Sequence, residues 1–196
     1  TRFYHIDGLR LDLMGILSTE LVNEIYLRCR SINPDFMVYG EGWDMPSFLP
    51  QNCRASIQNT GKMPFVAHFS DRFRDVIKGS TSAYEISNKG FCTGAEYLLD
   101  VVKNVLCASC VDFGAGQMFA NPRNVINYVE CHDNHTLWDK MRECCRGEER
   151  WIRKRRQEMM NAMVLLAQGI PFLHSGQEFA RTKHGAGNTY NQGDAV

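Results

Sequence analysis

Short apolar runs alternate along this chain with longer segments in which apolar residues recur every three or four positions. Short runs bounded by Gly, Pro, Asn or Asp are typical of buried strands, and the longer period is typical of helices that pack on one face. The pattern predicts strands at residues 8–13, 36–40, 65–69, 125–131 and 170–173. It predicts helices at residues 18–32, 72–78, 95–106 and 149–168.

Residues at the ends of these helices support the assignment. Ser18 is expected to be the N-cap of the first helix, and Asn33-Pro34 is expected to end it. Gly169 is expected to be the C′ residue of the last helix. The methionine-rich face of that helix, within residues 159–163, is expected to pack in the core and not to bind a ligand.

Alternation of strands and helices predicts an α/β fold with a parallel sheet. A complete (β/α)8 barrel takes about 250 residues, and five predicted strands in 196 residues fit its later part. We therefore expect a partial TIM (β/α)8 barrel, roughly strands 4 to 8. Residues 1–196 would form the C-terminal half of a catalytic domain cut from a longer protein, with the N-terminal strands and accessory domains absent. An open doubly wound sheet is the rival, but no Gly-rich phosphate loop follows any predicted strand.

Composition narrows the classes of function. The chain is 44% hydrophobic, and 22 basic residues balance 22 acidic ones, so we expect no nucleic-acid partner. The absence of a long apolar run predicts no membrane span. The eight cysteines include a Cys107–Cys110 CxxC pair without a second pair at zinc-ligand spacing. We expect free or buried thiols, which favour a cytoplasmic location, with secretion left open.

The first predicted strand has an unusual inner face. Leu9, Leu11 and Leu13 alternate with Arg10 and Asp12, and alternate side chains of a strand point to opposite faces. In a barrel the leucines would pack on the helices, and the charged pair would point inward at the end where barrel enzymes keep their chemistry. The alternative is a partly exposed antiparallel strand with a surface ion pair.

Two more acidic residues follow apolar runs. Glu41 comes directly after residues 36–40 and is flanked by glycines, which we expect to admit a bulky ligand. Trp43 offers a flat face for a sugar ring; the alternative is a loop Glu beside a core Trp. Asp133 follows residues 125–131 within His132-Asp133-Asn134-His135. This cluster lacks the spacing of a helical metal motif, so no metal site is predicted, although metal binding stays an alternative.

Three acidic groups at the ends of barrel strands would converge on one site, and paired carboxylates are the machinery of glycoside cleavage. One carboxylate must be ionised to attack the sugar, and another must be protonated to release the leaving oxygen. Arg10 favours the charged form of Asp12. Glu41, beside the apolar Trp43, suits the proton donor.

The same segments resemble glycoside hydrolase family 13, the alpha-amylase family. The resemblance implies that Asp12 is the nucleophile, that Arg10 positions it, and that Glu41 is the general acid/base. It implies that Asp133 stabilises the transition state and that His132 contacts the same sugar ring.

Further stretches resemble the type I pullulanase group of this family. They are Asp12–Gly15, Tyr39–Trp43, Asn127–Val129, Asn134–Lys140 and Gln168–Phe179, with Arg181, Lys183, Asn188 and Tyr190 at polar positions of the last loop. The resemblance implies retaining hydrolysis of α-1,6 branch linkages in an alpha-glucan substrate such as pullulan, with Asn188 and Tyr190 contacting sugar.

Two alternatives remain within the resemblance. One is an isoamylase-like or branching enzyme. The other is a non-catalytic sugar-binding relative, which should have lost a carboxylate, whereas Asp12, Glu41 and Asp133 are all present. We expect no cofactor; some relatives bind structural calcium, but no ligand set for it is visible. The isolated fragment is expected to be inactive, because a barrel without its first strands leaves sheet edges unpaired.

Overall fold

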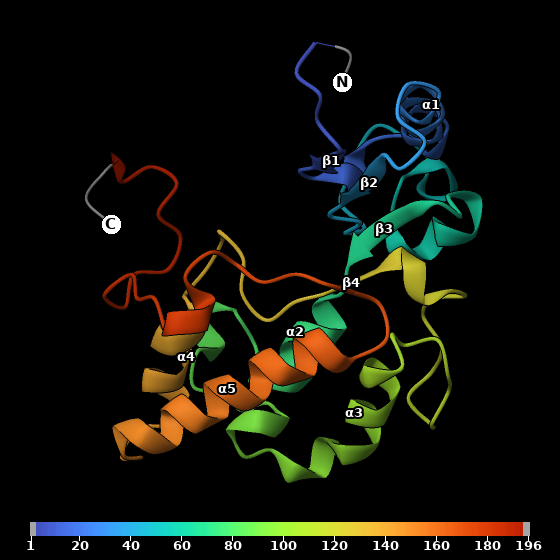
Figure 1. Ribbon diagram of the computed structural model, residues 1–196. Helices are drawn as coiled ribbons and strands as arrows, with labels where there is room; N and C mark the ends of the chain where they lie inside the picture. The colour runs from blue at the N-terminus through green and yellow to red at the C-terminus, as the bar shows by residue number, and fades with distance from the viewer. Residues whose placement is uncertain (1–2, 194–196) are drawn as a thin grey trace.

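A five-stranded parallel sheet forms the centre of the protein (Figure 1). The computed structural model describes residues 3–193 of the 196. The strands pair in chain order, each one parallel to the next. They are β1 Gly8–Leu11, β2 Met37–Gly40, β3 Val66–Phe69, β4 Val125–Asn127 and β5 Ile170–Pro171. This arrangement confirms the predicted α/β fold and forms part of a barrel.

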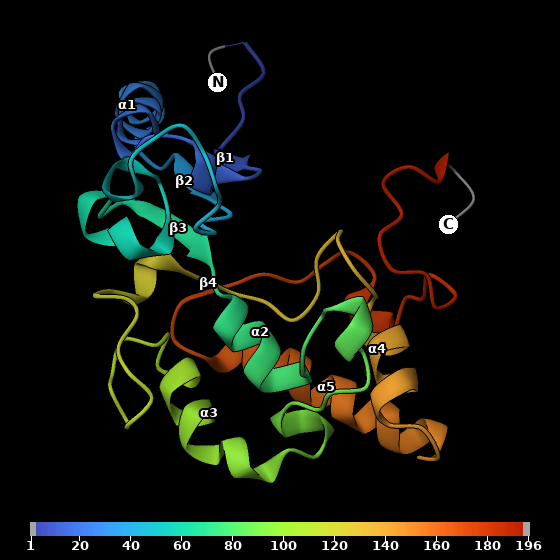
Figure 2. The same cartoon turned by 180° about the vertical axis from the view of Figure 1, so that it is seen from behind.

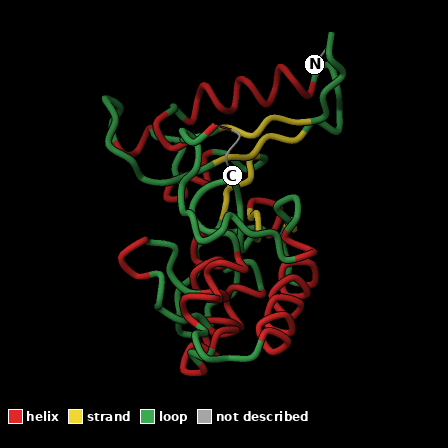
Figure 3. The backbone as a smooth tube through the Cα atoms, turned by 90° about the vertical axis from the view of Figure 1, so that its left-hand side faces the viewer, coloured by secondary structure: helices red, strands yellow, loops and turns green. Residues whose placement is uncertain are grey.

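Helices follow the strands and cover the outer side of the sheet. In Figures 1 and 3 helix α1 runs alongside β1 and β2, and the other four helices gather beyond β4. The helices are α1 Thr19–Arg30, α2 Asp71–Lys78, α3 Leu99–Leu106, α4 Leu137–Cys144 and α5 Arg150–Leu166. Short 3-10 helices span Met14–Ile16, Gln51–Cys53, Ile57–Lys62, Ala83–Glu85, Phe91–Thr93, Glu96–Leu98, Pro122–Asn124 and Gln177–Phe179. None of the helices within residues 3–193 is long and apolar enough to cross a bilayer.

Every predicted strand is present, but three of the five, β1, β4 and β5, end earlier than predicted. β1 stops at Leu11, because the chain then turns through Leu13, whose φ of 47° is left-handed. Leu13 is therefore 39% exposed, and the prediction that it packs on the helices is wrong. Leu9 and Leu11 do pack against the apolar cluster that contains Val22 of α1. This confirms the prediction that the leucine face of this strand packs on the helices.

Helix α4 was not predicted from the sequence. It lies in the segment between β4 and α5 and begins at its N-cap Thr136, whose side chain accepts a hydrogen bond from Asp139 N at 3.1 Å. Its buried apolar residues Leu137, Met141 and Cys144 have helical spacing. With only eight residues, the helix offers too few repeats of that spacing to stand out.

Other predicted helix ends need smaller corrections. Ser18 caps α1 as predicted, accepting a hydrogen bond from Leu21 N at 3.1 Å. Helix α5 ends at Leu166, so Gly169 lies beyond the C′ position, in the turn into β5. In the methionine-rich face Met160 is buried, but Met159 is 40% exposed, so that face is only partly core.

The concave side of the sheet is filled with aromatic side chains. Ala67, Phe69, Ile126 and Tyr128 form its buried cluster. The ring of Phe69 contacts Tyr128 and, edge to face, Phe172, with centroids 5.0 Å and 5.1 Å apart. This packing resembles the filled interior of a barrel. Seen from behind in Figure 2, the strands lie between α1 on one side and the group α2 to α5 on the other.

Candidate active site

Two of the predicted catalytic carboxylates follow neighbouring strands. Leu11 of β1 pairs in register with Gly40 of β2, so Asp12 and Glu41 leave the sheet side by side. Glu41 N donates to Leu11 O at 3.2 Å, which continues the pairing beyond the strands. The carboxyl ends of the parallel strands therefore bring the two side chains to one edge of the sheet, as the sequence predicted.

The guanidinium of Arg10 joins the two carboxylates. Its Nη2 donates to Glu41 Oε1 at 2.7 Å, and its Nη1 donates to Asp12 Oδ1. The group also lies over the ring of Phe69, 5.7 Å from the centroid. Burial acts to lower the pKa of Arg10, but the hydrogen bond to Asp12 and the charge of Glu41 outweigh it and raise that pKa. Arg10 thus stays charged and fixes both acidic groups.

The two carboxylates differ in their surroundings. The Glu41 side chain is 8% exposed, whereas that of Asp12 is 61% exposed. The second oxygen of Glu41 accepts a hydrogen bond from Leu13 N at 3.0 Å. The left-handed turn at Leu13 aims this N–H at the carboxylate. Glu41 is consequently held from two sides, and Asp12 presents a free edge to solvent.

The glycines around Glu41 serve packing and not ligand entry, which corrects the prediction. A Cβ on Gly40 would lie 2.4 Å from Leu11 O, and one on Gly42 would lie 2.3 Å from His68 Nδ1. Trp43 is half-buried and packs against the aromatic cluster of the concave side. Its carbonyl would clash with a Cβ on Gly15, at 1.8 Å. The segment thus follows the neighbouring chain too closely for larger residues.

A histidine completes the group. One ligand atom each from Asp12, Glu41 and His132 lies within 4.8 Å of the other two. His132 Nε2 is 3.5 Å from Arg10 Nη2 and also 3.5 Å from Asp133 Oδ2. The structure therefore brings Asp12, Glu41 and His132 together, while Asp133 reaches the group through His132.

Three such side chains resemble a ligand set for a metal ion, and their atoms are close enough for one. The Arg10 guanidinium, however, already lies among them and bonds to both carboxylates. A cation there would meet that positive charge at short range. The donor set therefore suits the charged side chain better than a metal ion.

The segment after β4 is anchored by the carboxylate of Glu130, a role that was not predicted from the sequence. Glu130 is 1% exposed, and its Oε1 lies 2.7 Å from His174 Nδ1. Its Oε2 accepts a hydrogen bond from Leu137 N at 2.6 Å. Glu130 thus ties the end of β4 to the start of α4 and to the loop after β5. An acidic residue within an apolar run was the only sign of this role in the sequence.

Two residues of the C-terminal loop, Lys183 and Asn188, hold the backbone on either side of Asp133. Lys183 Nζ donates to Asn134 O at 2.6 Å and to His132 O at 3.3 Å. Asn188 Oδ1 accepts a hydrogen bond from Asn134 N at 2.6 Å. Asn134 is left-handed, with φ of 60°, so these contacts stabilise a turn beside Asp133. Asn188, predicted to contact sugar, is engaged here by the backbone.

The remaining predicted contact stands apart. Tyr190 is 87% exposed and makes no hydrogen bond within residues 3–193.

Beside Asp12 and Glu41, the concave side of the sheet contains a cavity of about 190 Å³. It is lined by Arg10, Tyr39, Phe69, Cys131, His132, Phe172 and His174.

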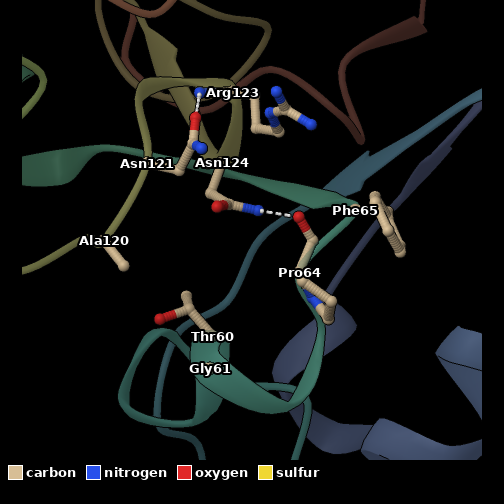
Figure 4. Close-up of a pocket in the computed structure, with 8 residues that line it drawn as sticks. All are labelled: Thr60, Gly61, Pro64, Phe65, Ala120, Asn121, Arg123 and Asn124. Carbon is tan, nitrogen blue, oxygen red and sulfur yellow. Dashed lines mark hydrogen bonds between the residues drawn. The ribbon is translucent and has the colours of Figure 1, made fainter.

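A larger depression, of about 320 Å³, lies at the opposite end of the strands (Figure 4). Its lining includes Phe65, which precedes β3, and Asn124, which precedes β4. Asn124 Nδ2 donates to Pro64 O at 3.0 Å, a contact marked by a dashed line in Figure 4. In the part of the chain that the structure describes, no acidic side chain lines this depression, so the group of Asp12, Glu41 and His132 is the better candidate for a catalytic site.

No family profile matches the chain, but individual relatives do. Over 193 residues it is 38% identical to the pullulanase of Bacillus subtilis (strain 168), covering 98% of this chain and 27% of that protein. A crystal structure of pullulanase from Anoxybacillus sp. LM18-11, complexed with maltotetraose, is 45% identical, with a TM-score of 0.91 over 96% of this chain and 26% of the other. Pullulanase type I from Bacillus subtilis str. 168, complexed with maltose, is 39% identical, with a TM-score of 0.92 over 95% and 26%.

The chain is similar to the pullulanases of glycoside hydrolase family 13. It spans about a quarter of the length of these pullulanases. The similarity confirms the resemblance drawn from the sequence, and the structural match confirms that the sheet is part of an α/β barrel.

Proposed function

We propose that this chain carries the catalytic residues of a retaining pullulanase that hydrolyses α-1,6 branch linkages in pullulan, starch or glycogen-derived dextrins. The observation that carries the proposal is the pairing of Asp12 and Glu41 on neighbouring strands, with oxygen atoms within 4.8 Å of each other and Arg10 between them. Retaining glycosidases hold their two carboxyl groups about 5 to 5.5 Å apart, and inverting ones hold them about 6.5 to 9.5 Å apart.

The resemblance to family 13 supplies the two roles, and the exposed position of Asp12 suits a nucleophile. Asp12 attacks the anomeric carbon and forms a glycosyl ester, and Glu41 gives its proton to the leaving oxygen. Water then attacks the ester while Glu41 takes the proton back. The catalytic groups of this mechanism are the side chains Asp12 and Glu41, so it calls for no cofactor.

The other predicted residues take supporting roles in this proposal. His132, within reach of both Arg10 and Asp133, contacts the sugar ring at the cleavage point, and Asp133 stabilises the developing positive charge. Trp43 and Tyr190 are proposed as further contacts to the alpha-glucan. Asn188 acts through the turn at Asn134.

The choice of α-1,6 linkages is supported by similarity. The Bacillus subtilis relative that covers 98% of the chain is named pullulanase, and the two pullulanase structures compared above hold maltotetraose and maltose. The chain spans only about a quarter of the length of these pullulanases, so its residues alone do not define the whole substrate site. The linkage is therefore tested on products and not on geometry.

The test uses the protein in its full natural length with pullulan as substrate. We expect maltotriose as the product, released first as the α-anomer in NMR spectra. Asp12→Asn and Glu41→Gln should each abolish turnover, and Asp100→Asn, on the exposed surface of α3, should leave it unchanged. Panose in place of maltotriose would overturn the linkage, and full activity of Asp12→Asn would overturn the site.

A further inference from the structure

Two adjacent cysteines lie at the end of α4. Cys144 is the last residue of the helix, Cys145 caps it, and their sulfur atoms are 3.8 Å apart. Consecutive side chains of a continuous helix diverge by about 100°. Cys145 leaves helical geometry, with φ of −117° and ψ of 38°, and this change turns the two thiols toward each other.

The pair is polarised into a nucleophile and a proton donor. The hydrogen bond between the two thiols lowers the pKa of Cys144, and the nearby Lys140 ammonium acts in the same direction against burial. The same hydrogen bond raises the pKa of Cys145. Thiolates are the reactive form of cysteine, so the contact activates Cys144 next to a second thiol.

Two other thiols, Cys110 and Cys92, have raised pKa values. Burial and the neighbouring Cys107 raise the pKa of Cys110, although these two form the CxxC pair that the sequence presents as the obvious dithiol. Burial raises the pKa of Cys92 to about 12. The structure thus selects the adjacent pair and not the CxxC pair.

We propose that Cys144 and Cys145 form a dithiol modification site that reacts with small disulfides. The Cys144 thiolate attacks one sulfur of the small disulfide, breaks its S–S bond and releases one thiolate. Cys145 then loses its proton and attacks the sulfur of Cys144 in the mixed disulfide, which releases the second thiolate. The protein loses two electrons and two protons, and the small disulfide is reduced to two thiols.

Both steps are compatible with the position of the pair. Cys144 is 6% exposed and Cys145 is 1% exposed, so the reagent enters when the end of α4 opens locally. The exposed residues Arg146 and Gly147 follow directly. Adjacent Cα atoms are about 3.8 Å apart, closer than the roughly 4.4 to 6.8 Å of most disulfides. The product is therefore strained and returns readily to the dithiol when a reductant is added.

Formation of the Cys144–Cys145 disulfide has a structural consequence. Cys145 Sγ contacts Thr93 O at 3.9 Å. Lys140 Nζ donates to Ile86 O at 2.7 Å and to Asn88 O at 2.6 Å. Oxidation withdraws the thiolate from Lys140 and the thiol from Thr93, so the contact between α4 and residues 86–93 loosens. This inference does not depend on the proposed function.

The test treats the folded full-length protein with oxidised glutathione at neutral pH, followed by alkylation and peptide mass mapping. We expect the peptide with Cys144 and Cys145 to lose two hydrogens, to regain them with dithiothreitol, and to react roughly tenfold or more faster than the Cys107–Cys110 peptide. A pair that stays reduced until the protein is unfolded would overturn the proposal, as would faster oxidation of the CxxC pair.

Variants separate the two roles. In Cys145→Ser, the glutathione adduct on Cys144 should persist, since no second thiol can displace it. In Cys144→Ser, Cys145 should stay unmodified, and an adduct there would contradict the assigned order of attack. Cys53→Ser, at a half-buried position elsewhere in the chain, should react as the natural protein does. The mass map of the natural protein stands alone if a variant fails to fold.

Discussion

Arg10 Nη2 lies 2.7 Å from Oε1 of Glu41, and this ion pair connects the ends of β1 and β2. The same guanidinium also bonds to Asp12. One cation thus sets the separation of the two carboxylates on which the proposed mechanism depends. Its planar fork of donors suits two carboxylates at once, which a lysine ammonium matches less well.

Removal of this cation should damage catalysis more than folding. We expect Arg10→Met to lower kcat on pullulan on the order of a hundredfold, because the two carboxylates lose their common donor and shift. Arg10→Lys should recover only part of the rate. Arg30→Met is the control, since Arg30 lies over the ring of Tyr26 on α1 and touches no catalytic group. Steady-state kinetics with circular dichroism measure both effects, and an unchanged kcat in Arg10→Met would contradict the role.

The turn beside Asp133 depends on Lys183, whose side chain is buried. Its ammonium group donates to the backbone carbonyls of His132 and Asn134, on either side of Asp133. We expect Lys183→Met to lower kcat with little change in KM, because the turn loses its anchor while the sugar contacts elsewhere remain. Lys154→Met, at an exposed position of α5, should have no effect. Equal loss of activity in both variants would show that charge alone, and not the anchor, matters.

Gly42 should not tolerate a methyl group. Its Cβ would approach the buried His68 ring at 2.3 Å, whereas a Cβ on Gly61 would meet nothing within 4 Å. We expect Gly42→Ala to lower the free energy of unfolding by about 1 to 3 kcal/mol through overpacking. Gly61→Ala serves as the matched control and should be neutral. Denaturant unfolding curves measure the difference, and equal stability of the two variants would contradict the packing around His68.

His68 should make the protein acid-sensitive. Burial lowers the pKa of this histidine from 6.5 to about 4, and neither ring nitrogen has a hydrogen-bond partner among the described residues. Between these two pH values the unfolded chain binds the proton and the folded chain does not, so stability falls as the pH drops from 6.5 toward 4. The loss is on the order of 3 kcal/mol.

A leucine at this position tests that interpretation. His68→Leu should flatten the fall of the melting temperature between pH 6.5 and 4. His184→Gln, which changes an exposed histidine, should leave it as it is. A natural protein with constant melting temperature over this range would contradict the buried neutral imidazole.

The strands and their order could be predicted from the sequence, because each strand is a short apolar run. The strand ends could not, since they depend on neighbouring backbone. Leu13 continues the alternating pattern of Leu9 and Leu11, yet it turns out of the sheet, where its N–H reaches Glu41 Oε2. Helix α4 was too short for its period to show.

The candidate site divides in the same way. The convergence of Asp12, Glu41 and Asp133 was predicted from strand ends. The structure brings Asp12 and Glu41 together with His132, and Asp133 reaches the group only through His132. The supporting contacts were not predicted, because they join residues distant in sequence. Glu130 meets His174 across 44 positions, and Asn188 meets Asn134 across 54. A pattern along the chain records which residues are polar but not which of them bond to one another.

A covalent intermediate is the most direct test of the proposed mechanism. Full-length protein carrying Glu41→Gln would be incubated with an α-glycosyl fluoride, whose good leaving group needs no proton donor, and then digested and mapped by mass spectrometry. We expect a glycosyl adduct on Asp12, since attack proceeds while hydrolysis of the ester lacks its base. Turnover of the fluoride without any adduct on Asp12, or an adduct on Asp133, would contradict it.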